Sequence, residues 1–211
     1  MRLSFRALAF AAVLGLGVVS SPKPADASVA IAVYFDDLVS RADTVAVVTG
    51  TETKSVWEDR KIVTYTRLRI ERHIAGETMT SDMWVKTLGG IVGDLGQTVS
   101  GEPAFGPGQT MVFLKKVDSR PTYMVIERAQ GQYPITKDAK TGRLVLGKNS
   151  EGGMLLPPKA PTSDVTPQKG PQVRAATRFA GYLAMDVMLH RPVDDVAKDI
   201  AESWQKLHAT K

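Results

Sequence analysis

Hydrophobic and polar residues alternate through most of residues 44–146, which is the pattern of β-strands with one buried face. The strands that this pattern predicts are Thr44–Trp57, Lys61–His73, Met83–Leu88, Thr110–Val117, Thr122–Glu127, the short extended piece Ala129–Ile135 and Arg143–Leu146. The first two are long and flank a charged turn at residues 58–60, so we expect them to form a hairpin. Two long, bent strands in succession favour a small barrel of five to seven strands over a flat sheet.

The second long strand changes its hydrophobic phase halfway along. Val63 and Tyr65 share one face of an ideal strand, whereas Leu68 and Ile70 share the other. A bulge near Thr66 would bring all four residues to the core side, and we therefore predict one there.

After residue 171 the hydrophobic period changes from two residues to 3.6, which predicts helices. The first C-terminal helix is expected at Gln172–His190 and the second at Val193–His208. The second has the clearest apolar stripe in the chain, formed by Val193, Val196, Ala197, Ile200, Trp204 and Leu207. A shorter helix is expected at Val33–Ala42, before the first long strand. The predicted fold is mainly β: a small OB-like barrel followed by a pair of C-terminal α-helices.

The two ends of the chain and one internal stretch differ in composition from the rest. Residues 1–27 read as a signal peptide, with Arg2 and Arg6 before the apolar run Ala7–Val19 and a small-residue cleavage site at 25–27. Residues 28–147 form the predicted barrel domain. Residues 148–171 hold five prolines and few apolar residues, which is typical of a linker. Residues 172–211 form the C-terminal helical segment.

Charge and cysteine content narrow the function classes. The whole chain of 211 residues has a formal net charge of +5 and no cysteine. Removal of the signal peptide takes away Arg2, Arg6, Lys23 and Asp26, which lowers the charge to +3. A charge this small does not indicate a nucleic-acid-binding protein. The lack of cysteine excludes disulfides, thiol catalysis and cysteine-bound zinc.

A glycine-rich segment connects the third predicted strand to the most apolar one. Seven glycines lie between Gly89 and Gly108. Glycine at this density exposes backbone groups and permits close packing or positive φ, so the segment could form a barrel mouth or a binding loop. We name Gly89, Gly90, Asp94, Glu102 and Phe105 as candidate ligand- or partner-binding residues. Phe105 is either an anchor for a partner or a plug that closes the barrel.

No motif in the sequence points to catalysis. His73, His190 and His208 do not form a metal-binding motif, and serine-hydrolase and phosphate-loop motifs are absent. Asp94 and Glu102 could act as an acid–base pair, but we favour the interpretation that they are two solvated loop carboxylates. Aromatic residues near Arg67, Arg69 and Lys115 could bind single strands or sugars, although core packing accounts for them as well. We therefore expect no catalytic residue, no metal and no cofactor.

Several short motifs resemble those of a group of uncharacterised exported bacterial proteins. They are Leu-Val-x-Arg-Ala-Asp at Leu38–Asp43, the Phe-x-x-Gly-Gln step at Phe105–Gln109, and Ala-Gln-Gly-x-Tyr at Ala129–Tyr133. The resemblance covers residues 33–135. The strand arrangement is also similar to the OB-like barrel of netrin-type and metalloproteinase-inhibitor modules, which depend on cysteines that this chain lacks. An inhibitory role therefore does not carry over.

These features together predict an exported binding protein. We expect a non-catalytic binding or cell-envelope-associated module, periplasmic or extracellular, whose partner is a protein or an envelope component. Nucleic acid is not an expected partner, and no integral membrane span is expected after signal cleavage. The alternative is a secreted hydrolase whose active site has no recognisable motif.

Overall fold

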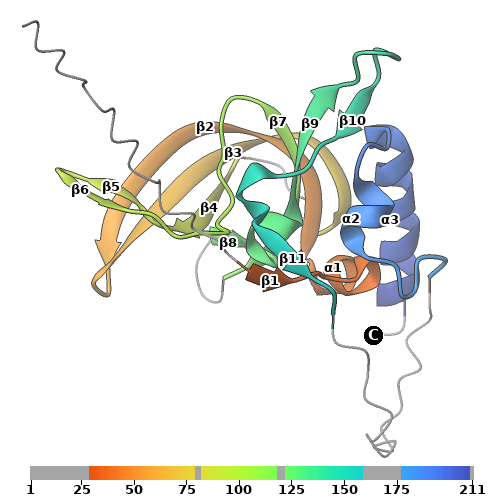
Figure 1. Ribbon diagram of the computed structural model, residues 1–211, viewed down its shortest axis with the longest axis horizontal. Coiled ribbons are helices and arrows are strands. Elements are labelled where there is room, and N and C mark those ends of the chain that lie inside the picture. The colour runs from red at the N-terminus through yellow and green to blue at the C-terminus, as the bar shows by residue number, and fades with distance from the viewer. Residues whose placement is uncertain (1–28, 79–81, 118–121, 159–176, 210–211) are drawn as a thin grey trace, which may run out of the picture.

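The computed structural model describes residues 29–78, 82–117, 122–158 and 177–209, so the predicted signal peptide, residues 1–27, lies outside the described residues. Seven strands form the main sheet in the order β10-β9-β7-β2-β3-β4-β8 (Figure 1). Their bounds are β2 (Thr44–Glu58), β3 (Lys61–Gly76), β4 (Met83–Leu88), β7 (Gln109–Lys116), β8 (Thr122–Val125), β9 (Gln132–Lys137) and β10 (Leu144–Leu146). The mainly β fold with C-terminal helices is thus confirmed.

The main sheet curls until β8, the strand at one end of it, returns to β7. β8 pairs with β4 in parallel and with β7 in antiparallel orientation. The strands β2, β3, β4, β8 and β7 therefore form a ring of pairings. The ring is nearly closed rather than a complete barrel, because β8 joins β4 at only two positions, Trp84↔Thr122 and Val85↔Tyr123. The strands β9 and β10 extend the sheet away from the ring, beyond β7.

Residues 44–49 of β2 and 110–114 of β7 are buried on both faces, because they separate two hydrophobic clusters. Side chains alternate along a strand, so Val45 and Phe113 face one cluster while Val48 and Val112 face the other. The first cluster, here called the helix-side core, fills the space between the sheet and the helices. The second, here called the ring interior, contains Ala46, Val48, Leu68, Met83, Val85, Val112, Leu114, Tyr123 and Val125.

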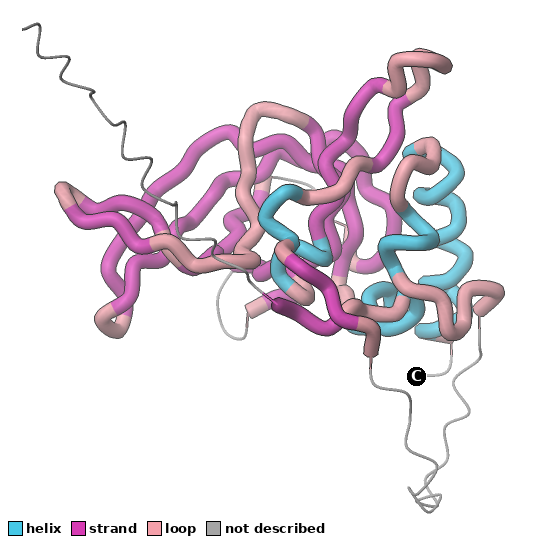
Figure 2. Tube along the Cα trace, in the orientation of Figure 1, coloured by secondary structure: helices cyan, strands magenta, loops and turns pink. Residues whose placement is uncertain are grey.

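Three helices cover the outer side of β2 and β7 (Figure 2). They are α1 (Phe35–Arg41), α2 (Ala184–Met188) and α3 (Val193–His208), and α3 has the predicted bounds. Residues 172–176 of the helix predicted at 172–190 lie outside the described residues, and between residues 177 and 190 the prediction is right only over α2. Gly181 has φ +81° and Leu183 forms a β-bridge to Tyr34, so the chain is turned and extended before α2 begins. In the described part of the chain, no helix is long and apolar enough to cross a membrane.

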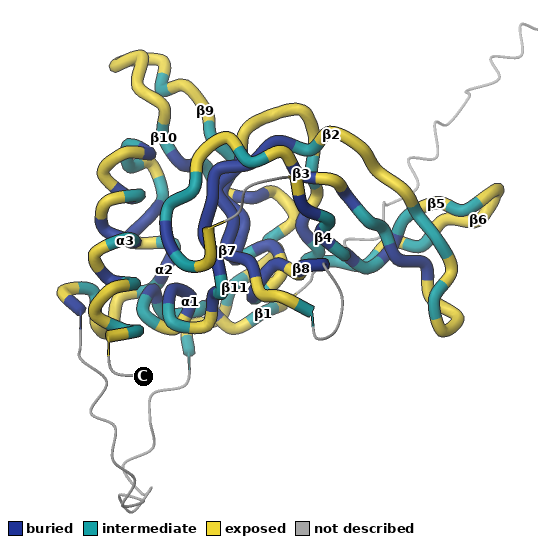
Figure 3. The backbone as a smooth tube through the Cα atoms, turned by 180° about the vertical axis from the view of Figure 1, so that it is seen from behind, coloured by how far each residue is buried: buried dark blue, intermediate teal, exposed yellow. Residues whose placement is uncertain are grey.

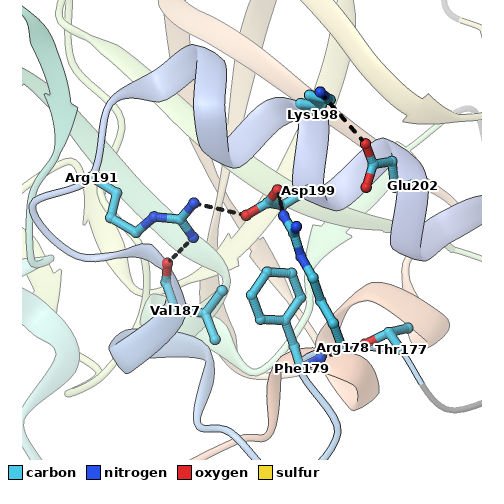
Figure 4. Close-up of polar contacts among 8 residues, drawn as sticks. All are labelled: Thr177, Arg178, Phe179, Val187, Arg191, Lys198, Asp199 and Glu202. Carbon is cyan, nitrogen blue, oxygen red and sulfur yellow. Dashed lines mark hydrogen bonds and ion pairs between the residues drawn. The ribbon is translucent and has the colours of Figure 1, made fainter.

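Buried polar contacts hold the chain after residue 177 against the helices (Figure 4). Asp199 of α3 has a side chain only 4% exposed, and it forms ion pairs with both Arg178 and Arg191. Arg191 also donates to the carbonyl of Val187 over 2.8 Å. These bonds fix the segment that leads into α2 against the inner face of α3.

Two smaller ribbons complete the fold. The strands β1 (Val29–Ile31) and β11 (Met154–Leu156) pair in parallel, and the 3₁₀ turn η2 (Ser150–Gly152) precedes β11. The first part of the predicted linker, residues 148–171, therefore contains regular structure, and residues 159–171 lie outside the described ones. In the glycine-rich segment, β5 (Gly90–Val92) and β6 (Leu95–Gln97) form a hairpin that projects on the side opposite α3 (Figure 1).

The long hairpin of β2 and β3 departs from the predicted register. Its turn, Asp59–Arg60, has φ of 46° and 63°, which is the two-residue turn that matches strand twist. Bulges occur between Val45 and Ala46, Val47 and Val48, and Gly50 and Glu52, so the predicted bulge near Thr66 is wrong. Residues 64 and 66 stay in phase with Leu68, and threonines therefore occupy ring positions that the prediction gave to Val63 and Tyr65.

Candidate functional site

A groove of about 470 Å³ opens at one end of the ring, where the apolar ring interior stops. We call it the ring groove. Its floor is the inner face of β2, β3 and β4, represented by Thr53, Thr64, Thr66 and Thr87. The β5–β6 hairpin forms one wall with Gly89–Ile91 and Gly96–Val99, and the loop at 102–105 forms another. Glu151 of η2 also reaches it.

The floor of the ring groove carries hydroxyl groups where the rest of the ring interior carries hydrocarbon. Thr64 Oγ1 donates to the carbonyl of Gly89 over 2.6 Å and lies 2.8 Å from Ser55 Oγ. Thr66 is only 4% exposed, yet its hydroxyl has no hydrogen bond to any described residue. Thr66 Oγ1 is not enclosed, because it keeps surface that is open to the ring groove, so water or a guest can bond to it. The floor is therefore suited to a guest that supplies hydrogen bonds.

Gly89 and Gly90 bring the β5–β6 hairpin close to the sheet. Both have positive φ, +89° and +134°. A Cβ on Gly90 would lie 2.3 Å from Thr64 Oγ1 and 2.4 Å from Ser55 Oγ, and one on Gly89 would lie 2.6 Å from the carbonyl oxygen of Gln97. Any side chain at either position would force the hairpin away from the hydroxyl floor.

Glu102 fastens the second wall to the end of β4. Its Oε2 accepts a hydrogen bond from the backbone N–H of Leu88 over 3.0 Å, and its Oε1 lies 3.3 Å from Nε of Arg128. The side chain is 13% exposed. Glu102 lines the ring groove, but its two oxygens already have protein partners, so its role is to position the loop.

Phe105 lies where the ring groove meets the apolar ring interior. It is half-buried and packs against the ring-interior cluster. A Cβ on Gly50 would come within 3.2 Å of the Cβ of Phe105, so the glycine at this bulge of β2 makes room for the loop. This position agrees with a plug more closely than with a fully exposed anchor.

The structure brings together four of the five candidate residues. Gly89, Gly90, Glu102 and Phe105 all line the ring groove, whereas Asp94 is exposed at the tip of the β5–β6 hairpin and does not. Asp94 and Glu102 therefore do not form an acid–base pair within one pocket. The described residues contain no group of three or more His, Asp or Glu side chains that could hold a metal.

The remaining candidate chemistry lies elsewhere. His73 contacts the carbonyl oxygen of Glu77, and the ring of His208 stacks on Trp204 with centroids 3.7 Å apart. Arg67 and Arg69 on the outer face of β3 form ion pairs with Asp82 and Glu71. Each of these histidine and arginine side chains therefore has a structural partner, and none of them needs a bound ligand to account for its position.

Sequence reasoning missed the threonines of the floor and Glu151. Thr64, Thr66 and Leu68 alternate along β3 and share one face of the strand. This alternation was the sequence signal that could have placed the two threonines in the ring. The charged side chains that line the ring groove, within the described chain, are Glu102 and Glu151. Glu151 has no ion-pair partner among the described residues, so the ring groove has an acidic edge.

Comparison with known proteins gives no relative for this arrangement. No family model, no curated protein and no solved structure matches the chain.

Proposed function

We propose that this protein is an exported, non-catalytic binding module of the cell envelope, and that the ring groove is its binding site. The observation that carries this proposal is the hydroxyl floor. The hydroxyl of Thr66 opens onto the ring groove and has no hydrogen bond to a described residue, so a guest that replaces water there can bond to it. The walls that surround the floor are held by short, specific contacts and form a largely prepared site.

The OB-like assignment of the ring belongs to the same proposal. OB folds are five-stranded, partly open barrels that bind ligands on one face and with the adjoining loops. Support comes from the five strands of the ring, from its incomplete closure at β8 and from the position of the ring groove beside two loops.

The binding proposal is tested by blocking the ring groove without disturbing the strand. Thr53 is exposed, lines the ring groove and sits on a strand, where tryptophan is well tolerated. Lys54 is the next residue and points to the opposite face, so Lys54→Trp is the matched control.

Immobilised wild-type protein and Lys54→Trp should retain the same component of an envelope extract, and Thr53→Trp should lose it. Equal retention by Thr53→Trp would show that the ring groove is not the site. The three proteins should also be screened with a broad panel of ester, glycoside and peptide substrates. Turnover that Thr53→Trp abolishes would establish the hydrolase alternative instead.

Export is tested by the mature N-terminus. The proposal expects mass spectrometry of protein recovered outside the cytoplasm of a Gram-negative host to place the first residue at or within a few residues of Ser28. An intact Met1 in the exported material would contradict cleavage.

A further inference from the structure

The strand β2 has an edge that the rest of the sheet does not use. β7 pairs with β2 from Thr44 to Thr49 only, whereas β3 pairs with β2 along its whole length. The hydrogen bond from Gly50 N–H to the carbonyl of Gly106, 3.0 Å long, is the last backbone contact across that edge in the described chain. Residues 51–57 therefore present an unpaired strand edge about 20 Å long, at about 3.3 Å per residue.

This open edge is continuous with the ring groove. Thr53 belongs to the edge and also lines the ring groove, and Phe105 marks the point where the glycine-rich loop parts from β2. Figure 3 shows this part of β2 as an exposed stretch that runs toward the turn of the β2–β3 hairpin. A guest in the ring groove thus meets an unpaired strand on one side and hydroxyl groups beneath it.

The chemistry of the lining favours one class of guest. An unpaired strand edge bonds to the backbone of an extended peptide, which adds to the sheet as a further strand. Sugars bind best against exposed aromatic faces, but among the described residues the sole aromatic side chain of the ring groove is Phe105, which packs on the ring interior. The acidic edge at Glu151 suits a guest with a positive charge.

We propose that the guest is an extended peptide segment of another protein, which pairs with β2 at residues 51–57 and places a Lys or Arg side chain beside Glu151. This inference rests on the proposed binding function and names its ligand class. The backbone pairing supplies affinity, and the hydroxyl floor together with Glu151 selects the side chains that point into the ring groove.

The test starts from a displayed library of random octapeptides, selected on the intact exported chain with counter-selection on Thr53→Trp. The inference expects enriched peptides with alternating β-branched residues and at least one Lys or Arg. The enriched consensus is then synthesised in two forms, one unmodified and one N-methylated at alternate residues, because methylation removes backbone donors and leaves the side chains in place.

Binding of the consensus should weaken by about tenfold or more on N-methylation and for Glu151→Lys, since each removes or reverses a direct contact. Asp186→Lys makes the same charge change on α2, away from the ring groove, and should change the dissociation constant by about twofold or less. Amide hydrogen exchange of residues 51–57 should slow when the peptide binds.

Three results would overturn the inference: no enriched peptide, equal binding of the methylated form, or unchanged exchange at residues 51–57. If a glycan array instead gives ligands that wild type and Lys54→Trp bind and Thr53→Trp does not, the binding function stands and the peptide inference fails. If neither library gives a ligand sensitive to Thr53→Trp, both fail.

Discussion

The two sides of β2 and β7 are built from alternate residues of the same strands, but they are filled in different ways. The helix-side core is mostly hydrocarbon, from Phe35 and Phe113 to Ile200, and the buried carboxylate of Asp199 beside it is paired with two arginines. The ring interior is hydrocarbon at one end, around Leu68 and Val85, and hydroxyl-lined at the other, around Thr64 and Thr66.

This difference separates the apolar region that stabilises the fold from the polar groove that we propose as a binding site. Burial of apolar side chains contributes about 25 cal/mol per Å², whereas a hydroxyl that lines an open groove can bond to water and adds little to stability. The pair Thr66 and Val85 shows the contrast at one register position, because the two residues lie opposite each other on β3 and β4.

The largest effect is expected in the helix-side core. Phe113 is fully buried and its ring meets that of Tyr133 with centroids 6.4 Å apart. Phe113→Ala should lower the free energy of unfolding by about 3–5 kcal/mol, which urea titration measures. Phe105→Ala is the matched truncation at the ring groove. Because Phe105 is only half-buried, a loss as large as that of Phe113→Ala would mean that the two regions are not different in kind.

The polar contacts of α3 come next. Asp199→Ala removes a buried carboxylate that two arginines share, and it should lower the free energy of unfolding by about 2 kcal/mol. Arg178 and Arg191 are partly exposed and can regain water, which limits the loss. Glu202→Ala breaks the exposed pair with Lys198 on the same helix and should cost about 0.5 kcal/mol or less. Equal losses would contradict the buried role of Asp199.

Alkaline pH should also weaken the helix-side core. Burial raises the pKa of Tyr133 well above its usual range, and Tyr133 stays protonated in the folded state when the unfolded chain begins to ionise near pH 10. The contribution of Tyr133 to the free energy of unfolding is fully present below pH 10. It is lost as pH rises further, by about 1.4 kcal/mol per pH unit at most. Tyr133→Phe should flatten the stability profile between pH 10 and 12. An unchanged slope would contradict this role.

Replacement of Thr110 is expected to have a smaller effect, and to raise the free energy of unfolding rather than lower it. Its side chain is buried in β7 and, within the described residues, its Oγ1 has no hydrogen-bond partner. Thr110→Val keeps the shape and removes the unpaired hydroxyl, so it should raise the free energy of unfolding by about 1 kcal/mol. A clear loss of stability would show that the hydroxyl is bonded, for example to water.

The sequence predicted the elements whose position depends only on the spacing of hydrophobic residues. The bounds of β4 and α3 follow from clean alternation and from one apolar stripe, and both were confirmed. The helix expected at 172–190 failed because Gly181 and the bridge at Leu183 set the backbone, and apolar spacing does not reveal either constraint.

Four of the five candidate residues line the ring groove, and their role in binding stays a prediction. Glycine density located the walls of the ring groove, because Gly89 and Gly90 are needed for close approach to the sheet. The threonine floor was missed because the prediction assumed that core positions are apolar and introduced a bulge to place Tyr65 there. Thr66 contradicts that assumption, because a threonine occupies a buried position that faces the ring.

The most direct test of the account exchanges the chemistry of the two residues that face each other across β3 and β4. Thr66→Val should leave the free energy of unfolding unchanged or raise it by about 1 kcal/mol, and it should weaken binding in the ring groove. Val85→Thr buries a new hydroxyl in the apolar half and should lower the free energy of unfolding by about 1–3 kcal/mol. If Thr66→Val instead destabilises the protein by as much as Val85→Thr does and leaves binding unchanged, the hydroxyl floor serves the fold and the ring groove is not a binding site.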